Sequence, residues 1–270
     1  MTELTGIPET MLWTLHNRAS EAVRPDGFIR DPEAARIYAS IDYDYARSFG
    51  RPDGSHATRS AMFDEVVGDW MKRHPGGTVV ELGCGLETQF QRIDDGQVRW
   101  LCVDVPEAIA VRERFLAPSE RCRFVPKSAL DLSWMESVEP SEPLFVTAQG
   151  LFMYFEEAEV KRLLTAILER FPDVELMFDV IPRWLSRKSM AGLQKTRHYR
   201  VPKMPWGIGQ GELEPLLRSW SPRIGSVRLM PYRRFRLFPW SLFPLMARIP
   251  GLREGMPWIV HLTASDARRS

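Results

Sequence analysis

The stretch from Thr78 to Phe90, Thr-Val-Val-Glu-Leu-Gly-Cys-Gly-Leu-Glu-Thr-Gln-Phe, decides the fold of this chain. Its first half is a short β-branched, apolar run, which is typical of a strand buried on both faces of a parallel sheet. Gly83 and Gly85 follow at once, and they allow a tight turn and a close approach of the backbone to a ligand. The residues after them predict a helix with free N–H groups at its start. Together these features predict a nucleotide-type cofactor site at the carboxyl edge of a parallel sheet.

Acidic residues around the turn indicate which cofactor binds there. A dinucleotide fingerprint has a third small residue three positions after the second glycine. In this chain that position is Thr88, and Glu87 precedes it. Glu87, and Glu81 at the end of the strand, would repel a pyrophosphate. S-adenosylmethionine has no phosphate and carries a sulfonium and an ammonium group, so the acids favour it over NAD. The alternative to a cofactor site is that the Gly-x-Gly turn has a purely structural role.

Composition limits the class of protein. A chain of 270 residues with 44% hydrophobic content can bury one sizeable core, so we expect a single domain over residues 1–270. The formal net charge of +1 gives no electrostatic reason to expect binding to nucleic acid or to an anionic membrane. Cys84, Cys102 and Cys122 lack the spacing of a disulfide framework or a zinc site, and no metal is expected. Without a signal peptide or a long apolar stretch, the expected location is the cytoplasm.

The N-terminal part of the chain predicts a helical lid over the sheet, spanning residues 1–55. Apolar residues recur at helical spacing over residues 8–24, and Asp31-Pro32 predicts the start of a second helix. A further helix is expected over residues 56–73, with Arg59 near its start. Its guanidinium is either a solvated surface group or a fork that binds the carboxylate of the methionine moiety.

Strands and helices alternate through the central part of the chain. This alternation predicts an α/β protein with a doubly wound, mostly parallel sheet and helices on both faces. The second strand ends at Asp104, where a βαβ unit places the carboxylate that binds ribose hydroxyls. Asp131 is a lone acid in a loop and either meets the adenine amino group or caps a helix. Further strands are expected over residues 98–104, 123–126, 144–150 and 174–180, and helices over residues 107–117 and 156–170.

Three motifs carry a resemblance to a known family: Glu81-Leu82-Gly83-x-Gly85-Leu86-Glu87-Thr88, Asp104-x-Pro106 and Gln149-Gly150-Leu151-x-Met153-Tyr154. They resemble the leucine carboxyl methyltransferase family, and most closely its bacterial branch of polyketide O-methyltransferases. The stretches Pro8–Leu12 and Phe178–Pro182 also match that branch, so the resemblance covers nearly the whole chain.

The resemblance implies a class I methyltransferase fold with a seven-stranded sheet and S-adenosylmethionine as the cofactor. It implies that Arg59 anchors the cofactor carboxylate and that Asp104 binds the ribose. Gln149 stands where the family usually has a glutamate, so a negative charge near the sulfonium is lost. The predicted cofactor-binding residues are Arg59, Glu81, Gly83, Gly85, Asp104, Val105, Asp131, Leu132 and Gln149.

The basic and aromatic stretch over residues 183–207 follows the fifth strand directly. It therefore starts at the carboxyl edge, where donor and acceptor must meet. We interpret it as a substrate-side insertion that closes over the acceptor together with the N-terminal lid; the alternative is a solvated connection. A helix over 211–220, a strand over 223–232, a short apolar helix over 241–249 and a closing strand over 256–263 are expected after it. The predicted substrate-binding residues are Tyr45, Tyr154, Trp184, His198, Tyr199, Arg200 and Trp206.

Methyl transfer is an in-line displacement, so positioning and desolvation supply most of the catalysis. A carboxylate acceptor needs no general base, whereas a phenol, with a pKa of about 10, does. His56 and His198 are the candidates, but each also fits a packing or surface role, and no catalytic residue is assigned. The expected function is O-methylation of an aromatic or polyketide-like small molecule at a carboxylate or phenol. Alternatives are carboxyl methylation of a protein C-terminus and a non-catalytic adenosyl-ligand-binding protein. The oligomeric state stays open.

Overall fold

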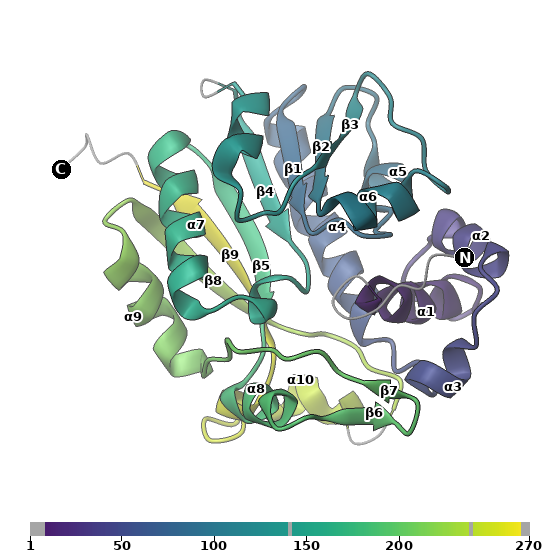
Figure 1. The fold of residues 1–270 in the computed structure, drawn as a ribbon. Helices are drawn as coiled ribbons and strands as arrows, with labels where there is room; N and C mark the ends of the chain where they lie inside the picture. Colours follow the sequence, from purple (N-terminus) through teal and green to yellow (C-terminus); the bar gives the residue numbers. More distant parts are fainter. Residues whose placement is uncertain (1–8, 140–141, 238–239, 266–270) are drawn as a thin grey trace.

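The computed structural model describes residues 9–139, 142–237 and 240–265, built around one seven-stranded sheet (Figure 1). The strand order is β3-β2-β1-β4-β5-β9-β8. The first five of these strands run parallel, whereas β9 is antiparallel to both β5 and β8. This confirms the predicted α/β fold with a mostly parallel, seven-stranded sheet. The strands are β1 (Thr78–Leu82), β2 (Arg99–Asp104), β3 (Cys122–Pro126), β4 (Leu144–Ala148), β5 (Glu175–Val180), β8 (Ile224–Pro231) and β9 (Trp258–Ala264).

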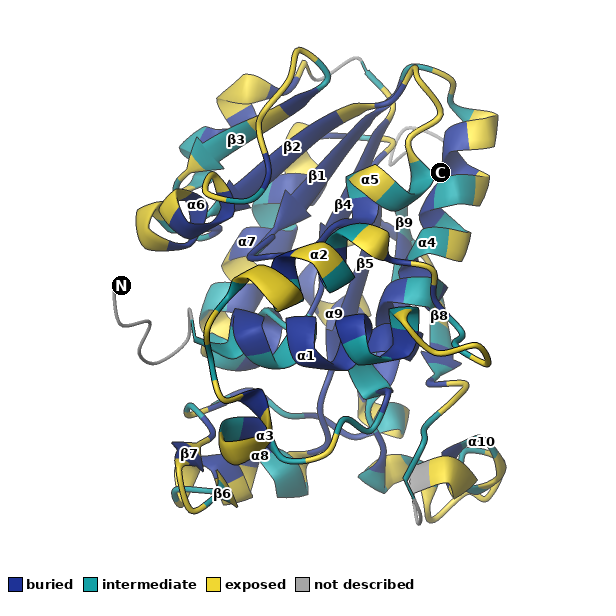
Figure 2. Cartoon of the chain, turned by 90° about the vertical axis from the view of Figure 1, so that its right-hand side faces the viewer, coloured by how far each residue is buried: buried dark blue, intermediate teal, exposed yellow. Residues whose placement is uncertain are grey.

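Helices cover both faces of the sheet because alternate residues of each strand face opposite sides. Val79 of β1 shares a core with Trp70 of α4 (Ser55–Arg73). Val80 belongs to the core on the other face, with Leu164 of α7 (Glu157–Arg170). β1, β4 and β5 are buried along their whole length, as their dark blue colour in Figure 2 shows. The further elements are α5 (Gln89–Ile93), α6 (Pro106–Arg112), α9 (Gln210–Trp220), and the 3-10 turns η1 (Leu132–Ser137), η2 (Phe152–Tyr154) and η4 (Arg253–Gly255).

Three elements differ from the expectation. The chain continues as a loop to Thr88 after the glycine turn, and α5 is only 5 residues long. Helix α6 ends at Arg112, short of residue 117. The helix expected over residues 241–249 is divided into η3 (Trp240–Leu242) and α10 (Phe243–Met246). Pro244 lies in the first turn of α10, where the missing N–H costs nothing, so it helps to start this helix and does not interrupt it.

The N-terminal residues form α1 (Thr10–Ala22), α2 (Pro32–Ser40) and α3 (Tyr45–Phe49). The Asp31 carboxylate accepts a hydrogen bond from the Ala34 N–H at 2.9 Å and caps α2, which confirms the predicted helix start. It also lies 3.2 Å from Nε of Arg18 and 2.8 Å from Nη1 of Arg92. These buried ion pairs join α1 and α2 to α5, next to the glycine turn. Residues 1–8 of the predicted lid lie outside the described residues.

The stretch after β5 forms α8 (Arg183–Met190) and a hairpin of β6 (Gln194–Thr196) and β7 (Tyr199–Arg200). The Thr196 hydroxyl donates to the carbonyl oxygen of Ser48 at 2.9 Å, and the Tyr199 ring meets the Phe49 ring at 4.9 Å. Figures 1 and 2 both place this hairpin beside α3. Two segments far apart in sequence are therefore in contact.

Among the described residues, no helix combines the length and the apolar content needed to cross a membrane.

Candidate active site

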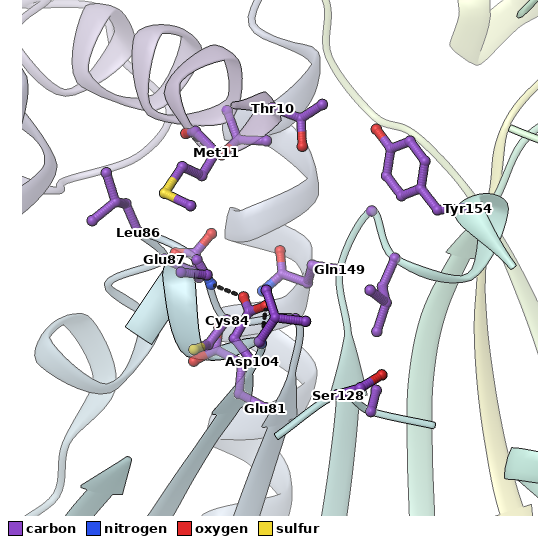
Figure 3. A pocket seen from close by; sticks show the side chains of 18 of the residues that line it. Thr10, Met11, Glu81, Cys84, Leu86, Glu87, Asp104, Ser128, Gln149 and Tyr154 are labelled. Carbon is purple, nitrogen blue, oxygen red and sulfur yellow. Dashed lines mark hydrogen bonds between the residues drawn. The ribbon is translucent and has the colours of Figure 1, made fainter. Parts of the chain in front are cut away.

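A cavity of about 380 Å³ lies at the carboxyl ends of β1, β2 and β4. Gly83 and Gly85 line it together with Asp104, which ends β2. Thr10 and Met11 close it from α1, and Figure 3 shows them across from Asp104 and Gln149. The two glycines, the acid at the end of β2 and Gln149 thus meet in one place, which we call the donor cavity.

The glycine turn requires glycine at both positions. Gly83 has a φ of +67° and Gly85 a φ of +43°, which L-residues with a side chain rarely adopt. A Cβ atom on Gly83 would lie 2.8 Å from Cδ1 of Leu151. The turn is held from the other side because the Asp104 carboxylate accepts from the N–H groups of Gly85 and Val105, both at 2.8 Å. Burial raises the pKa of Asp104, although these two donors oppose the shift.

Glu81 places a second carboxylate in the donor cavity. It is 1% exposed, and its Oε2 accepts from the indole N–H of Trp100 at 3.2 Å. Its Oε1 is buried without a hydrogen-bond partner among the described residues. Burial raises the pKa of Glu81 well above its usual range. A buried acceptor without a partner is costly, and a ligand that brings a cation or a hydrogen-bond donor would remove that cost.

Arg59 is buried, with 5% exposure, which excludes the solvated surface role. Its Nη1 donates to Oδ2 of Asp179 at 3.0 Å. Asp179 also accepts from the hydroxyl of Tyr232 at 3.1 Å and from the N–H of Gly150 at 2.5 Å. The guanidinium lies against Gly150, where a Cβ would be 2.7 Å from Nη1. Glycine at position 150 therefore makes room for a charged group that lines the donor cavity.

A second cavity, of about 470 Å³, adjoins the first. Arg59, Gly150 and Tyr154 line both cavities, as do Thr10 and Thr14 of α1. The walls of the second cavity are largely aromatic and aliphatic. They come from α1, α4, α8, the β6–β7 hairpin, the residues after β4 and β5, and the chain after β8. Burial raises the pKa of Tyr154 to about 12, so its hydroxyl is protonated at neutral pH. We call this space the acceptor cavity.

The structure brings most of the predicted cofactor residues together, but not Asp131 and Leu132. Asp131 is exposed, and its side chain accepts a hydrogen bond from the N–H of Ser133 at 3.1 Å. Asp131 therefore caps the 3-10 turn η1. Ser128 and Ala129 of the same loop line the donor cavity, because the chain turns away before it reaches residue 131. The predicted cofactor residues that line the donor cavity are Arg59, Glu81, Gly83, Gly85, Asp104, Val105 and Gln149.

Of the predicted substrate residues, Tyr154 and Trp184 line the acceptor cavity. The other five lie elsewhere in the structure. Tyr45 and Tyr199 are buried among the aromatic side chains of the N-terminal helices, and Trp206 packs against Trp220 at 6.0 Å. In the β6–β7 hairpin successive side chains point to opposite sides, so Tyr199 faces inward. His198 and Arg200 are exposed on either side of it.

Sequence patterns predict only some of the residues that line the donor and acceptor cavities. Thr10 and Thr14 are one helical turn apart on α1, so their spacing could have indicated a shared face. Trp13, Lys188 and Lys195 also line the acceptor cavity, and they belong to no sequence motif that would identify them.

Within the described part of the chain, no group of three or more His, Cys, Asp and Glu side chains could hold a metal ion.

These residues fit S-adenosylmethionine. The cavity offers a carboxylate at the end of β2, a buried unpartnered acceptor at Glu81 and a guanidinium at Arg59. The sheet order and this cavity define a class I methyltransferase. The crystal structure of the carbon methyltransferase CurJ supports the fold, with a TM-score of 0.51, 13% identity, and coverage of 96% of this chain and 68% of its own.

The family follows from the sequence comparisons. The leucine carboxyl methyltransferase model matches residues 11–168. The tetracenomycin polyketide synthesis O-methyltransferase TcmP of Streptomyces glaucescens is 32% identical over 83% of this chain and 82% of its own. The S-adenosyl-L-methionine-dependent methyltransferase dpfgK of Gibberella zeae is 30% identical over 65% of this chain and 66% of its own. The chain belongs to the leucine carboxyl methyltransferase family, and it is an S-adenosylmethionine-dependent methyltransferase.

Proposed function

We propose that this enzyme methylates an oxygen atom of a flat, apolar small molecule, either a carboxylate or a phenol. The observation that carries the proposal is the wall shared by the two cavities. Arg59, Gly150 and Tyr154 line both, so a ligand in the donor cavity lies next to a ligand in the acceptor cavity. Holding two reactants side by side in this way supplies much of the rate enhancement of a transfer reaction.

S-adenosylmethionine, when bound, supplies a methyl group on a positively charged sulfur. In the donor site that we propose, Asp104 accepts hydrogen bonds from the ribose and Arg59 binds the methionine carboxylate. Gln149 is neutral and lies among polar side chains, within 3.4 Å of both Ser60 and Gln89. Glu81, with its unpaired oxygen, lies in the same cavity, and so do Asp104 and Glu87. Acidic groups therefore still face a cationic ligand although the family glutamate is absent.

The acceptor cavity suits an aromatic molecule. Its volume of about 470 Å³ lies within the range of small-molecule sites. Trp13 and Trp184 offer flat walls, and Met153 and Met204 offer adaptable ones. The name of the Streptomyces relative, which refers to polyketide synthesis, agrees with an acceptor of this kind.

The N-terminal helices and residues 183–207 act as a lid in this proposal. Both segments line the acceptor cavity: Thr10, Trp13 and Thr14 of α1, and Trp184 and Lys188 of α8. Limited trypsin digestion tests the closure, since cuts near Lys188 and Lys195 should slow when S-adenosylhomocysteine and an aromatic acceptor are present. Equal cleavage rates in both samples would leave these segments as ordinary packing.

Calorimetry and methyl transfer test the function itself. S-adenosylhomocysteine should bind, whereas NAD and ATP should not. Transfer of a labelled methyl group should be seen to 2-naphthol or to 2-naphthoic acid, which have the same flat rings and differ only in the acceptor group. Tight NAD binding, or methylation of peptide C-termini in place of both aromatic compounds, would contradict the proposal.

A further inference from the structure

The charges of this chain are distributed very unevenly. The chain has 36 Lys and Arg residues and 35 Asp and Glu residues. Residues 183–203 and 232–253 hold twelve of these cations and no acid, so the rest of the chain has 24 cations against 35 acids. The net charge of +1 conceals this separation, which is why it gave no reason to expect an anionic partner. A local field depends on where the charges lie and not on their sum.

The two basic stretches lie at the same end of the molecule, and we call them together the basic end. The first forms α8, the β6–β7 hairpin and the chain up to residue 203, and the second follows β8 and contains α10. Figures 1 and 2 both place α8, the hairpin and α10 at one end of the fold. The indole N–H of Trp184 on α8 donates to the carbonyl oxygen of Gly255, two residues after the second stretch, at 2.8 Å.

Most cations of the basic end have no acid beside them. Four arginines form ion pairs with acids: Arg183, Arg233, Arg236 and Arg253. The other eight cations are exposed and form no ion pair with the described residues: Arg187, Lys188, Lys195, Arg197, Arg200, Lys203, Arg234 and Arg248. The chain around α3, which contacts the hairpin, adds two exposed acids and two exposed arginines, so it leaves this balance unchanged: Asp42, Asp44, Arg47 and Arg51.

The basic end also exposes apolar side chains. The large hydrophobic side chains that are exposed among the described residues are Val23, Met190, Leu242, Leu245, Ile249 and Leu252. All of them except Val23 belong to the basic end, one on α8 and four within residues 242–252. Leu245 is 59% exposed and Ile249 is 51% exposed. Apolar side chains that gather on one surface indicate a site of interaction.

Cations of one sign together with apolar side chains favour a lipid surface as the partner. The core of a protein–protein interface is depleted of charged residues, and of lysine in particular. A segment that combines Lys and Arg with exposed Leu and Ile is instead typical of the membrane interface, where the cations attract anionic headgroups and the apolar groups enter the acyl boundary. Trp184 and Phe243 of the same elements line the acceptor cavity, so this surface adjoins that cavity.

We propose that the basic end docks on an anionic phospholipid surface, with its unpaired cations at the headgroups and Leu245 and Ile249 inserted between them. The contact is peripheral, since no helix of the described residues could span a membrane. This inference goes beyond the proposed function and does not depend on it, because it concerns where the enzyme acts and not which atom it methylates.

Sedimentation of the full chain with lipid vesicles tests the docking. The enzyme should bind vesicles of phosphatidylcholine with about 30% phosphatidylglycerol at least ten-fold more tightly than vesicles of phosphatidylcholine alone. Because the attraction is electrostatic, raising the salt from about 0.1 M to about 0.5 M should weaken this binding by about ten-fold. Equal binding to the two kinds of vesicle, or binding to neither, would overturn the proposal.

Charge reversal tests which surface binds. Arg187→Glu combined with Arg248→Glu should weaken binding to the anionic vesicles by at least about 25-fold, since each cation near the surface contributes about five-fold. Arg114→Glu combined with Arg170→Glu is the matched control, because it changes the net charge equally at exposed positions outside the basic end. This control should bind as wild type does. Equal losses in the two double variants would show that overall charge drives binding and would overturn the role of the basic end.

Removal of apolar side chains separates a lipid surface from a soluble polyanion. Leu245→Ser combined with Ile249→Ser should weaken vesicle binding by about ten-fold, whereas Val23→Ser, at the exposed apolar residue outside the basic end, should not weaken it. The Kd of S-adenosylhomocysteine and the Tm should be unchanged in these variants, since the three residues are exposed. Polyglutamate that binds as tightly as the vesicles, with no effect of the two serines on either, would identify a soluble acidic partner and overturn the lipid assignment.

Discussion

Replacing Asp31 by alanine should destabilise the fold more than the loss of an ordinary helix cap. Asp31 is 1% exposed and accepts from the Ala34 N–H at the start of α2. It also pairs with Arg18 at 3.2 Å and Arg92 at 2.8 Å, and it accepts from the Thr88 hydroxyl at 2.7 Å. One carboxylate thus joins α1, α2 and the loop that leads into α5.

The magnitude follows from these contacts. Loss of the cap costs about 1 kcal/mol. Leaving two buried arginines with one anion fewer costs about 3 kcal/mol, the lower end of the range for a broken buried pair, because Glu87 still contacts both of them. The free energy of unfolding should therefore fall by about 4 kcal/mol in Asp31→Ala, a large part of the stability of an ordinary domain.

Urea unfolding at pH 7, followed by tryptophan fluorescence, measures this change. Asp44→Ala is the matched control because Asp44 is exposed and caps α3 without pairing with a buried arginine, so it should lose only about 1 kcal/mol. Asp31→Asn, which keeps the cap but not the charge, should fall between the two. Equal losses in Asp31→Ala and Asp44→Ala would refute the reasoning, since the ion pairs would then contribute nothing.

Three further substitutions test the site and the sheet. Asp104→Ala should raise the Kd of S-adenosylhomocysteine by about ten- to a hundred-fold, measured by calorimetry, because an ionised acceptor for the ribose is lost; an unchanged Kd would place the ribose elsewhere. Gly83→Ala should lower both Tm and donor affinity, since the residue has a φ of +67° and its new Cβ would enter a crowded space. Desolvation raises the pKa of Glu175, but hydrogen bonds from His261 and Arg73 outweigh it and hold the pKa at about 2. The stabilisation by Glu175 is thus full above the unfolded-state pKa of about 4.3 and is lost as the pH falls through about 2, so Glu175→Gln should lower Tm at pH 7 but not near pH 2.

Local patterns predicted the sheet and the donor site because both depend on neighbouring residues. A β-branched run followed by two glycines specifies a buried strand and a tight turn within a few residues. The carboxyl ends of parallel strands meet at one edge, so Asp104, at the end of the second strand, could be expected beside the glycine turn. Gln149 was assigned to the same site by the family resemblance. The structure places both of them in the donor cavity.

Predictions that depended on the direction of a single side chain were correct for Trp184 and Tyr154, which line the acceptor cavity, but wrong at other positions. Trp206 and Tyr199 suit a flat-walled substrate site by chemistry, yet both are buried in the core. Asp131 lies only two residues beyond Ala129, but a turn of the chain puts one outside the lining and the other in it. The sequence gives the chemical type of each of these side chains, aromatic or acidic, but not the direction in which the side chain points in the fold.

The sequence alone determined the order of strands and helices, the glycine turn and the acids that favour S-adenosylmethionine, because each is encoded within a few residues. Only the tertiary structure decided which distant groups meet. Arg59 pairs with Asp179, which lies 120 positions further along the chain, and His56 faces a cavity whose walls come from both halves of the chain. Such contacts depend on packing between elements, and packing fixes burial, charge pairing and the empty space that a ligand can fill.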